Sequence, residues 1–285
     1  MSKLKKVICI VGPTASGKTN LSLALANIFR TEIINCDSVQ VYQELNIGSA
    51  KITLLEQQNI KHHLLDIVSV GTDYSIYDFQ KDARLIIDQI KLPILVGGSG
   101  LYLKSALFNY DLKKRTQQAL PSLDEMITAL KLNYPNQSLD YENPYRVTSY
   151  YQQHIQNFQI NTNQGKDEPL YDILTLYLDI DRQTLRQRVS QRIDLMLNQG
   201  LIEEVNDLLK KGYDLNIIGY KQISRYLKNE ITLQEAKELI INATMQYAKR
   251  QKTWFKHQMP TISLNALDPD LIDKSIKIIK EFINE

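Results

Sequence analysis

Short runs in which nearly every residue is apolar divide the first hundred residues and predict strands buried on both faces of a sheet. The runs cover residues 7–11, 32–36, 64–68 and 94–96, and another follows at 173–178. Residues 77–90 instead carry apolar side chains near a period of 3.6, which predicts a helix. Strands that alternate with helices predict an α/β fold, with a parallel sheet and right-handed crossovers.

Helical periodicity dominates the second half of the chain. A long helix is expected after Asp181. Its apolar stripe consists of Leu185, Val189, Ile193 and Met196. Further helices are expected at 219–228 and 232–258, the second of which starts with a capping-box pattern. Asp268 and Pro269 form a cap and first-turn pair that predicts a last helix.

The composition changes between about residues 110 and 169, which are rich in Gln, Asn and Tyr. We interpret this segment as a small, mostly helical domain inserted into a core formed by residues 1–109 and 170–285. Apolar residues at helical spacing favour at least one helix in it, and they are Leu123, Met126, Ile127, Leu130 and Leu132. The alternative is a disordered linker.

A glycine-rich turn joins the first predicted strand to the first helix, and its spacing, G-x-x-x-x-G-K-[ST], is that of a P-loop. The turn consists of Gly12, Pro13, Thr14, Ala15, Ser16, Gly17, Lys18 and Thr19. The two glycines let backbone N–H groups surround a phosphate at a helix N-terminus, and the Lys18 ammonium adds positive charge. The Thr19 hydroxyl is placed to reach a Mg²⁺ ion held by the phosphates. The turn therefore predicts that a phosphorylated ligand such as ATP binds here, without identifying that ligand.

Overall composition indicates the size of the core and the expected cellular compartment, but it does not identify the ligand. The 285 residues are 43% hydrophobic, which suffices for a substantial core, and the net charge of +2 does not demand a nucleic-acid partner. Cys9 and Cys36 lie in apolar runs, so we expect small buried side chains in a reducing compartment, without a disulfide or a metal. No apolar run is long enough for a signal peptide or a membrane helix. We therefore expect a cytoplasmic, monomeric protein without membrane contact.

Candidate chemistry gathers where the predicted strands end, because ligands of parallel sheets bind beyond the carboxyl ends of the strands. Asp37 ends the strand next to the P-loop, and the turn 97–100 ends another. The acid that usually ends a strand in an ATPase is missing from that turn, and Asp66 is the one remaining candidate. This pattern favours a group transfer in which diphosphate is bound but not hydrolysed, with Asp37 free to act as a base. The plainer alternatives are a capping role for Asp37 and a simple strand-to-helix turn at 97–100.

The long helix carries two arginines that are able to clamp such an anion. Arg188 and Arg192 lie four residues apart, so they share a face, and Arg192 is nearer to the apolar stripe. Arg182 and Arg186 fall on the opposite flank of this helix. The alternative for Arg188 and Arg192 is a solvated helix face.

Cations and aromatic residues are interleaved over residues 247–257, near the end of the longest predicted helix. Phosphate contacts combined with base stacking suit single-stranded RNA. The alternative is that Tyr247 and Trp254 belong to the core and that the cations are solvated.

Several stretches together resemble the bacterial tRNA dimethylallyltransferase (tRNA isopentenyltransferase) family. Besides the P-loop, they are residues 37–42, 46–51, 62–66, 74–75, 78–79, 97–102, 200–205, 218–221, 248–251 and 254–255. The resemblance covers most of the chain, and the combination is more specific than a P-loop alone.

The resemblance implies a P-loop fold that binds dimethylallyl diphosphate and moves the dimethylallyl group to the exocyclic amine of the adenosine 3′ to the tRNA anticodon. It implies that Asp37 accepts the amine proton, while Lys18, Arg192, and Thr19 with Mg²⁺ stabilise the leaving diphosphate. Ser99 stands where the family usually has Thr, and its hydroxyl is still able to donate, so the resemblance implies that Ser99 keeps the catalytic role of this position. The residues implied to contact the anticodon stem-loop are Asp37, Ser38, Val39, Gln40, Ser99, Arg146, Gly219, Tyr220, Lys221, Lys249, Arg250 and Gln251, with Gln40 near the flipped base.

The inserted segment departs from the family pattern. It is shorter than usual, and the R-x-x-R pattern near its end begins at Arg146 but has Ser149 in the place of the second arginine. Arg115 is a further candidate for an RNA contact in this insert. Three other functions stay open: a small-molecule kinase, a non-catalytic tRNA-binding relative, and prenylation of free adenine nucleotides.

Overall fold

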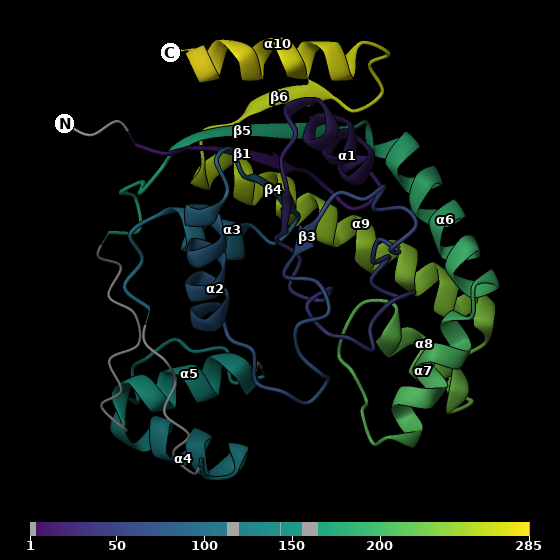
Figure 1. Ribbon diagram of the computed structural model, residues 1–285. Coiled ribbons are helices and arrows are strands. Elements are labelled where there is room, and N and C mark those ends of the chain that lie inside the picture. Colours follow the sequence, from purple (N-terminus) through teal and green to yellow (C-terminus); the bar gives the residue numbers. More distant parts are fainter. Residues whose placement is uncertain (1–3, 113–119, 143, 156–164, 285) are drawn as a thin grey trace.

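The computed structural model describes residues 4–112, 120–142, 144–155 and 165–284. In these residues, a six-stranded parallel sheet runs in the order β3-β2-β4-β1-β5-β6 (Figure 1). The strands are β1 (Lys6–Val11), β2 (Ile33–Asn35), β3 (His62–His63), β4 (Ile94–Gly97), β5 (Asp172–Asp179) and β6 (Ile262–Asn265). The predicted α/β fold with a parallel sheet is confirmed.

Helices alternate with the strands in the first half of the chain and follow one another in the second. They are α1 (Lys18–Phe29), α2 (Ile76–Gln89), α3 (Gly100–Leu107), α4 (Leu123–Asn133), α5 (Pro144–His154), α6 (Arg182–Asn198), α7 (Leu201–Lys210), α8 (Tyr220–Leu227), α9 (Leu233–Gln258) and α10 (Leu271–Asn284). None of these helices is both long and apolar enough to cross a membrane.

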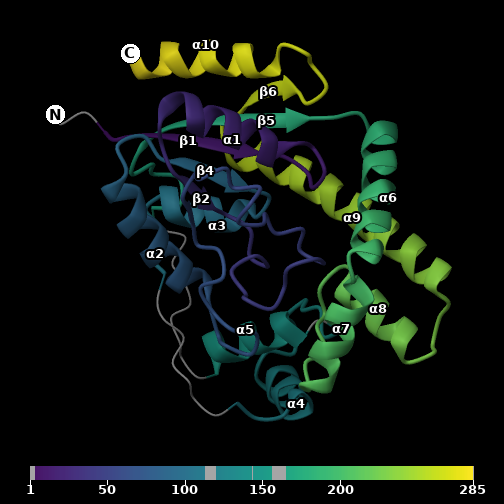
Figure 2. The same ribbon diagram turned by 45° about the vertical axis from the view of Figure 1, so that its right-hand side comes forward.

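The two faces of the sheet are covered by different helices, and β1 shows the division. Its odd-numbered residues, Val7, Cys9 and Val11, pack in one cluster with α2, α3 and the end of α9. Ile8 and Ile10 pack in another cluster with α1 and α10. Successive strand residues point to opposite faces, so this apolar run is buried on both sides, as predicted. Figure 2 shows α10 and α9 on opposite sides of the sheet. Cys9 is buried as a free thiol, and so is Cys36.

A third hydrophobic cluster joins α6, α7, α8 and the first half of α9. Helix α9 therefore takes part in two clusters, with Ile240 and Met245 in this one and Phe255 in the cluster against the sheet. Because α6 packs against the first half of α9, the arginines of α6 are held beside the carboxyl ends of the strands.

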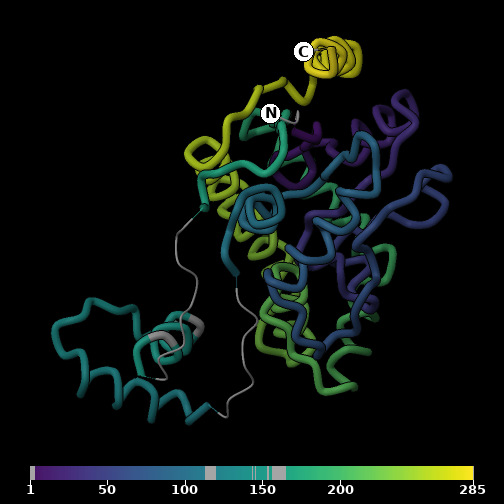
Figure 3. Tube along the Cα trace, turned by 60° about the vertical axis from the view of Figure 1, so that its left-hand side comes forward, coloured from purple at the N-terminus to yellow at the C-terminus, as the bar shows by residue number. Residues whose placement is uncertain are grey.

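Helices α4 and α5 pack against each other around Met126, Leu130 and Val147. Figure 3 shows the pair as a lobe apart from the sheet. On the core side of this lobe, the Asn109 N–H donates to the Glu168 carbonyl at 2.9 Å. The chain thus leaves the core and returns to it at neighbouring points.

Three predictions of the fold differ from the structure, and one strand was missed. The strand expected at 64–68 is wrong: β3 ends at His63, and the φ angles of +60° at Leu64 and +55° at Asp66 break the extended conformation. The expected position of Asp37 next to the P-loop strand is also wrong, since β4 lies between β1 and β2. Helix α10 begins at Leu271 and not at the predicted Pro269. Finally, β6 was not predicted, because it is short and largely exposed.

Candidate active site

The turn between β1 and α1 has the conformation of a phosphate-binding loop. Gly12 and Gly17 adopt φ angles of +150° and +93°, and a Cβ on Gly12 would lie 2.8 Å from the Leu178 carbonyl oxygen. Only glycine fits both positions without strain. The Lys18 ammonium donates to the carbonyl oxygens of Gly12 and Pro13 at 3.0 and 2.7 Å. It therefore lies over the loop where an anion would sit.

Asp37 follows β2 in a turn that buried Asn35 holds in place. The Asp37 N–H donates to Asn35 Oδ1 at 3.1 Å, and Asn35 Nδ2 donates to the Leu64 carbonyl at 3.0 Å. Asp37 Oδ1 accepts the Val39 N–H at 2.9 Å. Within the described residues, Asp37 Oδ2 has no hydrogen-bond partner. This carboxylate is thus fixed through one oxygen and open at the other, so it caps the turn and leaves one oxygen able to accept a proton.

Lys18 and Arg192 bring two partly buried cations close to this carboxylate. Burial and, to a lesser extent, the Arg192 charge lower the pKa of Lys18 to about 8, although the Asp37 charge opposes both effects. Burial also lowers the pKa of Arg192, again against the effect of Asp37. Arg192 Nη1 donates to Thr14 Oγ1 at 3.1 Å, which ties α6 to the P-loop. Two repelling cations beside one carboxylate favour an anionic ligand with more than one negative charge.

Two cavities meet at these residues. The first, which we call the P-loop cavity, has a volume of about 600 Å³ and is lined by Thr19, Asn35, Gln40, Arg188 and other polar residues. The second, the apolar cavity, has a volume of about 330 Å³. Its walls include Val189, Ile193, Met196, Leu201, Ile217 and Ile240. The residues common to both cavities are Thr14, Lys18, Asp37, Ser49 and Arg192. The charged cluster therefore lies between a polar compartment and an apolar one.

Ser99 and Tyr247 close the side of the site formed by the end of β4. Ser99 Oγ accepts the Ser38 N–H at 3.2 Å, so the ends of β2 and β4 are tied together. The Tyr247 phenol interacts with Ser99 and Gln251, and its pKa is raised by burial and by the Asp37 charge. Gln251 Nε2 donates to the Gly98 carbonyl at 3.0 Å. Trp254 packs against Gly100, so the aromatic residues of α9 belong partly to the core, as the simpler interpretation predicted.

The loop 46–49 forms another wall, and the carboxylate of Glu204 holds it. Glu204 Oε2 accepts the N–H groups of Asn46 and Ile47 at 3.1 and 2.8 Å, and Oε1 accepts the Gly48 N–H at 3.0 Å. The Tyr220 hydroxyl also donates to Oε1, at 2.6 Å. One side chain on α7 therefore fixes the loop that presents Ser49 to both cavities.

The structure brings together only some of the residues that were predicted to contact tRNA. Asp37, Ser38, Val39, Gly219 and Gln251 line the apolar cavity. Gln40 lines the P-loop cavity, where its amide donates to the carbonyls of Ser49 and Ala50. The side chains of Lys221, Lys249 and Arg250 are exposed and lie outside both cavities.

Other predicted positions are corrected or lie elsewhere. Tyr220 is only 1% exposed, so its hydroxyl holds Glu204 and its ring is not available to contact RNA in this conformation. Asp66 pairs with Lys51 and lines neither cavity, which removes it as the acid of an ATPase. Arg146 lies exposed on α5, 3.5 Å from Asp140, and Arg115 falls outside the described residues.

The described residues fit a Mg²⁺ ion only together with a ligand. They contain no group of three or more His, Cys, Asp or Glu side chains able to hold a metal by themselves. The Thr19 side chain is exposed at the start of α1 and lines the P-loop cavity. Mg²⁺ commonly binds through ligand phosphates, waters and one or two protein oxygens, and this arrangement offers one such oxygen.

Asn35 and Glu204 are the functional candidates that sequence reasoning missed. Asn35 was seen only as part of an apolar run, and Glu204 only as part of a motif. A polar amide at the end of a buried strand is the signal that was available for Asn35. Glu204 meets its partners in the loop 46–48 more than 150 positions away in the chain, and periodicity gives no signal for such contacts.

Comparisons with known proteins agree on one family. The IPP transferase family model matches residues 40–258. The chain is 50% identical over 280 residues to the tRNA dimethylallyltransferase of Acholeplasma laidlawii, covering 98% of this chain and 99% of that protein. A relative of the same name from Onion yellows phytoplasma is 52% identical over 288 residues, with 98% and 99% coverage.

Solved structures give the same picture. The crystal structure of tRNA delta(2)-isopentenylpyrophosphate transferase from Staphylococcus epidermidis matches with a TM-score of 0.74 and 33% identity, over 97% of this chain and 99% of that one. A eukaryotic dimethylallyltransferase acting on tRNA matches with a TM-score of 0.76 and 28% identity, over 98% of this chain and 80% of that one.

Proposed function

The chain belongs to the IPP transferase family, and we propose that it transfers a dimethylallyl group from dimethylallyl diphosphate to the exocyclic amine of the adenosine 3′ to the anticodon in tRNA. The observation that carries this proposal is the shared wall of the two cavities. A base, Asp37, and two cations, Lys18 and Arg192, stand between a polar compartment suited to diphosphate and an apolar one suited to a prenyl chain.

The P-loop cavity takes the diphosphate. Backbone N–H groups at the start of α1 and the Lys18 ammonium bind its oxygens. Arg192 reaches it from α6, beside its present partner Thr14, and Arg188 adds charge from the same cavity wall. A diphosphate satisfies both repelling cations, so the ligand relieves the electrostatic cost of the empty site.

The dimethylallyl chain extends past this wall into the apolar cavity, where it meets the adenine. In the reaction, the allylic C–O bond breaks and the amine nitrogen forms a bond to that carbon. The amine proton goes to the open oxygen of Asp37, and diphosphate leaves with the C–O electron pair. Because an aromatic amine is a weak nucleophile, charge stabilisation of the leaving diphosphate by Lys18 and Arg192 is the largest contribution.

A Mg²⁺ ion held by the diphosphate oxygens and the Thr19 hydroxyl would supply further neutralisation of the leaving group. Ser99 keeps the β2 and β4 turns together through Ser38. It thereby helps to maintain the orientation of Asp37 through a hydroxyl that Ser and Thr share.

The partner is the anticodon stem-loop, whose adenosine leaves the base stack to reach Asp37. Ser38, Val39, Gln40, Gly219 and Gln251 form the rim that the base passes. Phosphate contacts come from the exposed cations Lys221, Lys249, Arg250 and Arg146, with α4 and α5 as an inserted tRNA-binding lobe between residues 110 and 169.

The test is an incubation of the protein with Mg²⁺, dimethylallyl diphosphate and an unmodified anticodon stem-loop RNA, with ATP and small acceptors in parallel. The expected product is RNA that has gained one dimethylallyl group on the adenosine 3′ to the anticodon, detected by mass spectrometry. Transfer of the γ-phosphate of ATP without prenylation would contradict the proposal and favour a kinase. Binding of the RNA without any transfer would favour a non-catalytic relative.

A further inference from the structure

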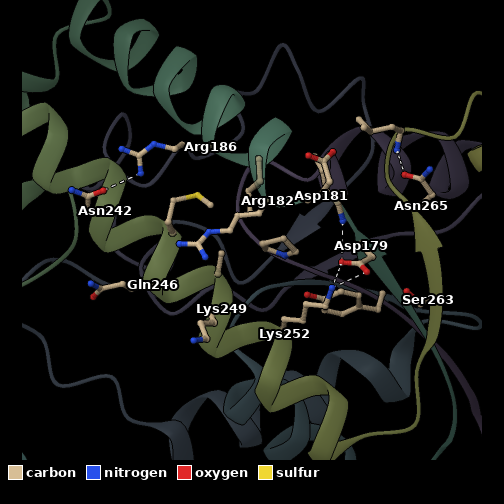
Figure 4. Close-up of a pocket in the computed structure, with 17 residues that line it drawn as sticks. Asp179, Asp181, Arg182, Arg186, Asn242, Gln246, Lys249, Lys252, Ser263 and Asn265 are labelled. Atoms are coloured by element: carbon tan, nitrogen blue, oxygen red, sulfur yellow. Dashed lines mark hydrogen bonds and ion pairs between the residues drawn. The ribbon is translucent and has the colours of Figure 1, made fainter.

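A third cavity lies between the start of α6, the middle of α9 and the ends of β5 and β6, and the proposed reaction does not use it. We call it the α6–α9 cavity (Figure 4). Its volume of about 980 Å³ exceeds that of either cavity of the candidate active site. It shares no lining residue with them, although Pro13 of the P-loop borders it. It is therefore a separate compartment on the same rim of the sheet.

Two cations in this cavity are without protein partners. Figure 4 shows the Arg182 side chain extending from α6 toward α9, where Lys249 lies. Neither side chain has a hydrogen bond or ion pair to any described residue. Their neighbours differ: Lys252 pairs with Asp179 at 2.7 Å, and Arg186 donates to Asn242 at 3.0 Å. Arg182 and Lys249 are thus the unpaired cations of a cavity whose lining also includes the Asp181 carboxylate, which accepts the Thr184 N–H at 2.8 Å as the cap of α6.

Tyr177 gives an independent indication of a ligand. Its side chain lines the cavity and is 5% exposed, yet its hydroxyl has no hydrogen-bond partner among the described residues. Buried hydroxyls nearly always have a partner, so we expect a bound molecule, either a water or the ligand of this cavity, to complete its hydrogen bonding. Burial and the nearby Asp179 raise the pKa of Tyr177, which keeps the hydroxyl protonated as a donor.

The rest of the lining combines amides with apolar surface. Asn242, Gln246 and Asn265 supply donors and acceptors, while Leu185 and Met245 supply apolar contacts. Amides recognise the edge of a nucleobase, apolar side chains pack on its face, and cations bind phosphate. A nucleotide combines these three features in one molecule.

We infer that the α6–α9 cavity is a second nucleotide site, in which Arg182, Lys249 and the Tyr177 hydroxyl bind the phosphate-bearing part of the ligand. The nucleotide has two possible sources, a free nucleoside phosphate or one nucleotide of the tRNA strand. Gln246 and Lys249 also line the shallow groove beside Arg250 and Trp254, so a strand on α9 has a continuous path into the cavity. Only the tRNA source rests on the proposed function, because the binding of a free nucleotide does not require prenyl transfer.

The test is calorimetric titration of adenosine 5′-monophosphate into the full chain, with saturating Mg²⁺ and inorganic diphosphate present to occupy the P-loop. We expect one saturable site. Arg182→Ala should weaken its affinity about tenfold, as expected for the loss of a charge-assisted hydrogen bond. Tyr177→Phe should weaken it about threefold while thermal stability is unchanged or raised, since the hydroxyl has no protein partner to lose. Lys256→Ala, an exposed lysine of α9 outside the cavity, is the matched control and should bind like the wild type.

A second titration, in the presence of anticodon stem-loop RNA, separates the sources. Displacement of the mononucleotide by RNA identifies a tRNA nucleotide, and simultaneous binding identifies a free nucleotide. The inference is overturned if the wild type shows no saturable binding, or if the Arg182 and Tyr177 variants both bind as tightly as the control. Because neither readout requires turnover, failure of prenyl transfer would leave this result interpretable.

Discussion

The Tyr220 hydroxyl donates a 2.6 Å hydrogen bond to Glu204, the carboxylate that also accepts three backbone N–H groups of the loop 46–48. The Tyr220 ring lies so close to Gly48 that a Cβ there would meet it at 2.6 Å. The two side chains therefore hold one wall of both cavities, although neither lies in the P-loop or beside Asp37.

Glu204→Ala should lower the free energy of unfolding by roughly 1–3 kcal/mol, because it leaves N–H donors of this loop without their acceptor. Urea denaturation measures the effect. Glu203→Ala is the matched control, since Glu203 is exposed at the preceding position of α7, and it should stay within about 0.5 kcal/mol of the wild type. Equal effects of the two variants would show that Glu204 does not hold the loop.

Arg192→Ala should reduce kcat by roughly 10²-fold or more, because it removes a cation that stabilises the leaving diphosphate. Steady-state prenylation of anticodon stem-loop RNA measures it. Arg225 is a partly exposed arginine of α8 that pairs with Glu230 at 3.1 Å and lines neither cavity. Arg225→Ala removes the same charge and should retain wild-type kcat. An Arg192→Ala enzyme with normal kcat would remove this residue from the mechanism.

The lowered pKa of Lys18 predicts that diphosphate binding depends on pH. Folding lowers its pKa from an ordinary value of 10.5 to about 8, so between these values the unfolded chain binds more protons and the stability of the ligand-free protein rises with pH. Bound diphosphate favours the charged form, so binding takes up a proton above about pH 8. The affinity should therefore fall as the pH rises through this range.

Lys18→Arg is the comparison, because arginine keeps its charge across this range. Calorimetry with inorganic diphosphate between pH 7 and 10 should show a steeper loss of affinity for the wild type than for the variant. Parallel profiles would mean that Lys18 does not titrate in the binding step.

Lys249 and Arg250 should contribute to RNA affinity through phosphate contacts. Replacing both by Ala should weaken binding of the stem-loop and reduce the slope of log K against log salt by about 0.7 for each lost contact. Fluorescence anisotropy at several salt concentrations measures the slope. The control replaces Lys277 and Lys280, which are exposed on α10 at the opposite face of the sheet, and an equal change of slope in the control would indicate bulk charge alone.

Local sequence patterns were enough to predict most of the elements. The capping residues Thr232 and Glu235 fix the start of α9 as expected, with both reciprocal hydrogen bonds present. The prediction of a strand at 64–68 was wrong because apolar content does not reveal the positive φ angles of Leu64 and Asp66. The predicted order of strands was wrong for a different reason. Periodicity describes each strand separately, and only packing decides that β4 separates β1 from β2.

The sequence allowed prediction of those candidate site residues whose signal lies within one short stretch of the chain. The P-loop motif is such a stretch, and so is the end of the apolar run that Asp37 follows. Asn35, Glu204 and the contact between Arg192 and Thr14 act through partners distant in the chain or through burial. The same limit explains Tyr220, whose position in a motif predicted an RNA contact and whose burial gives it a structural role.

Single-turnover prenylation by Asp37→Asn tests the central claim most directly, because the amide keeps the size of the side chain but cannot accept the amine proton. The variant should bind dimethylallyl diphosphate and stem-loop RNA with wild-type affinity. It should form prenylated RNA roughly 10²-fold or more slowly, the loss expected when a general base is removed. Formation of prenylated RNA at the wild-type rate would contradict the assignment of Asp37 as the base between the two cavities.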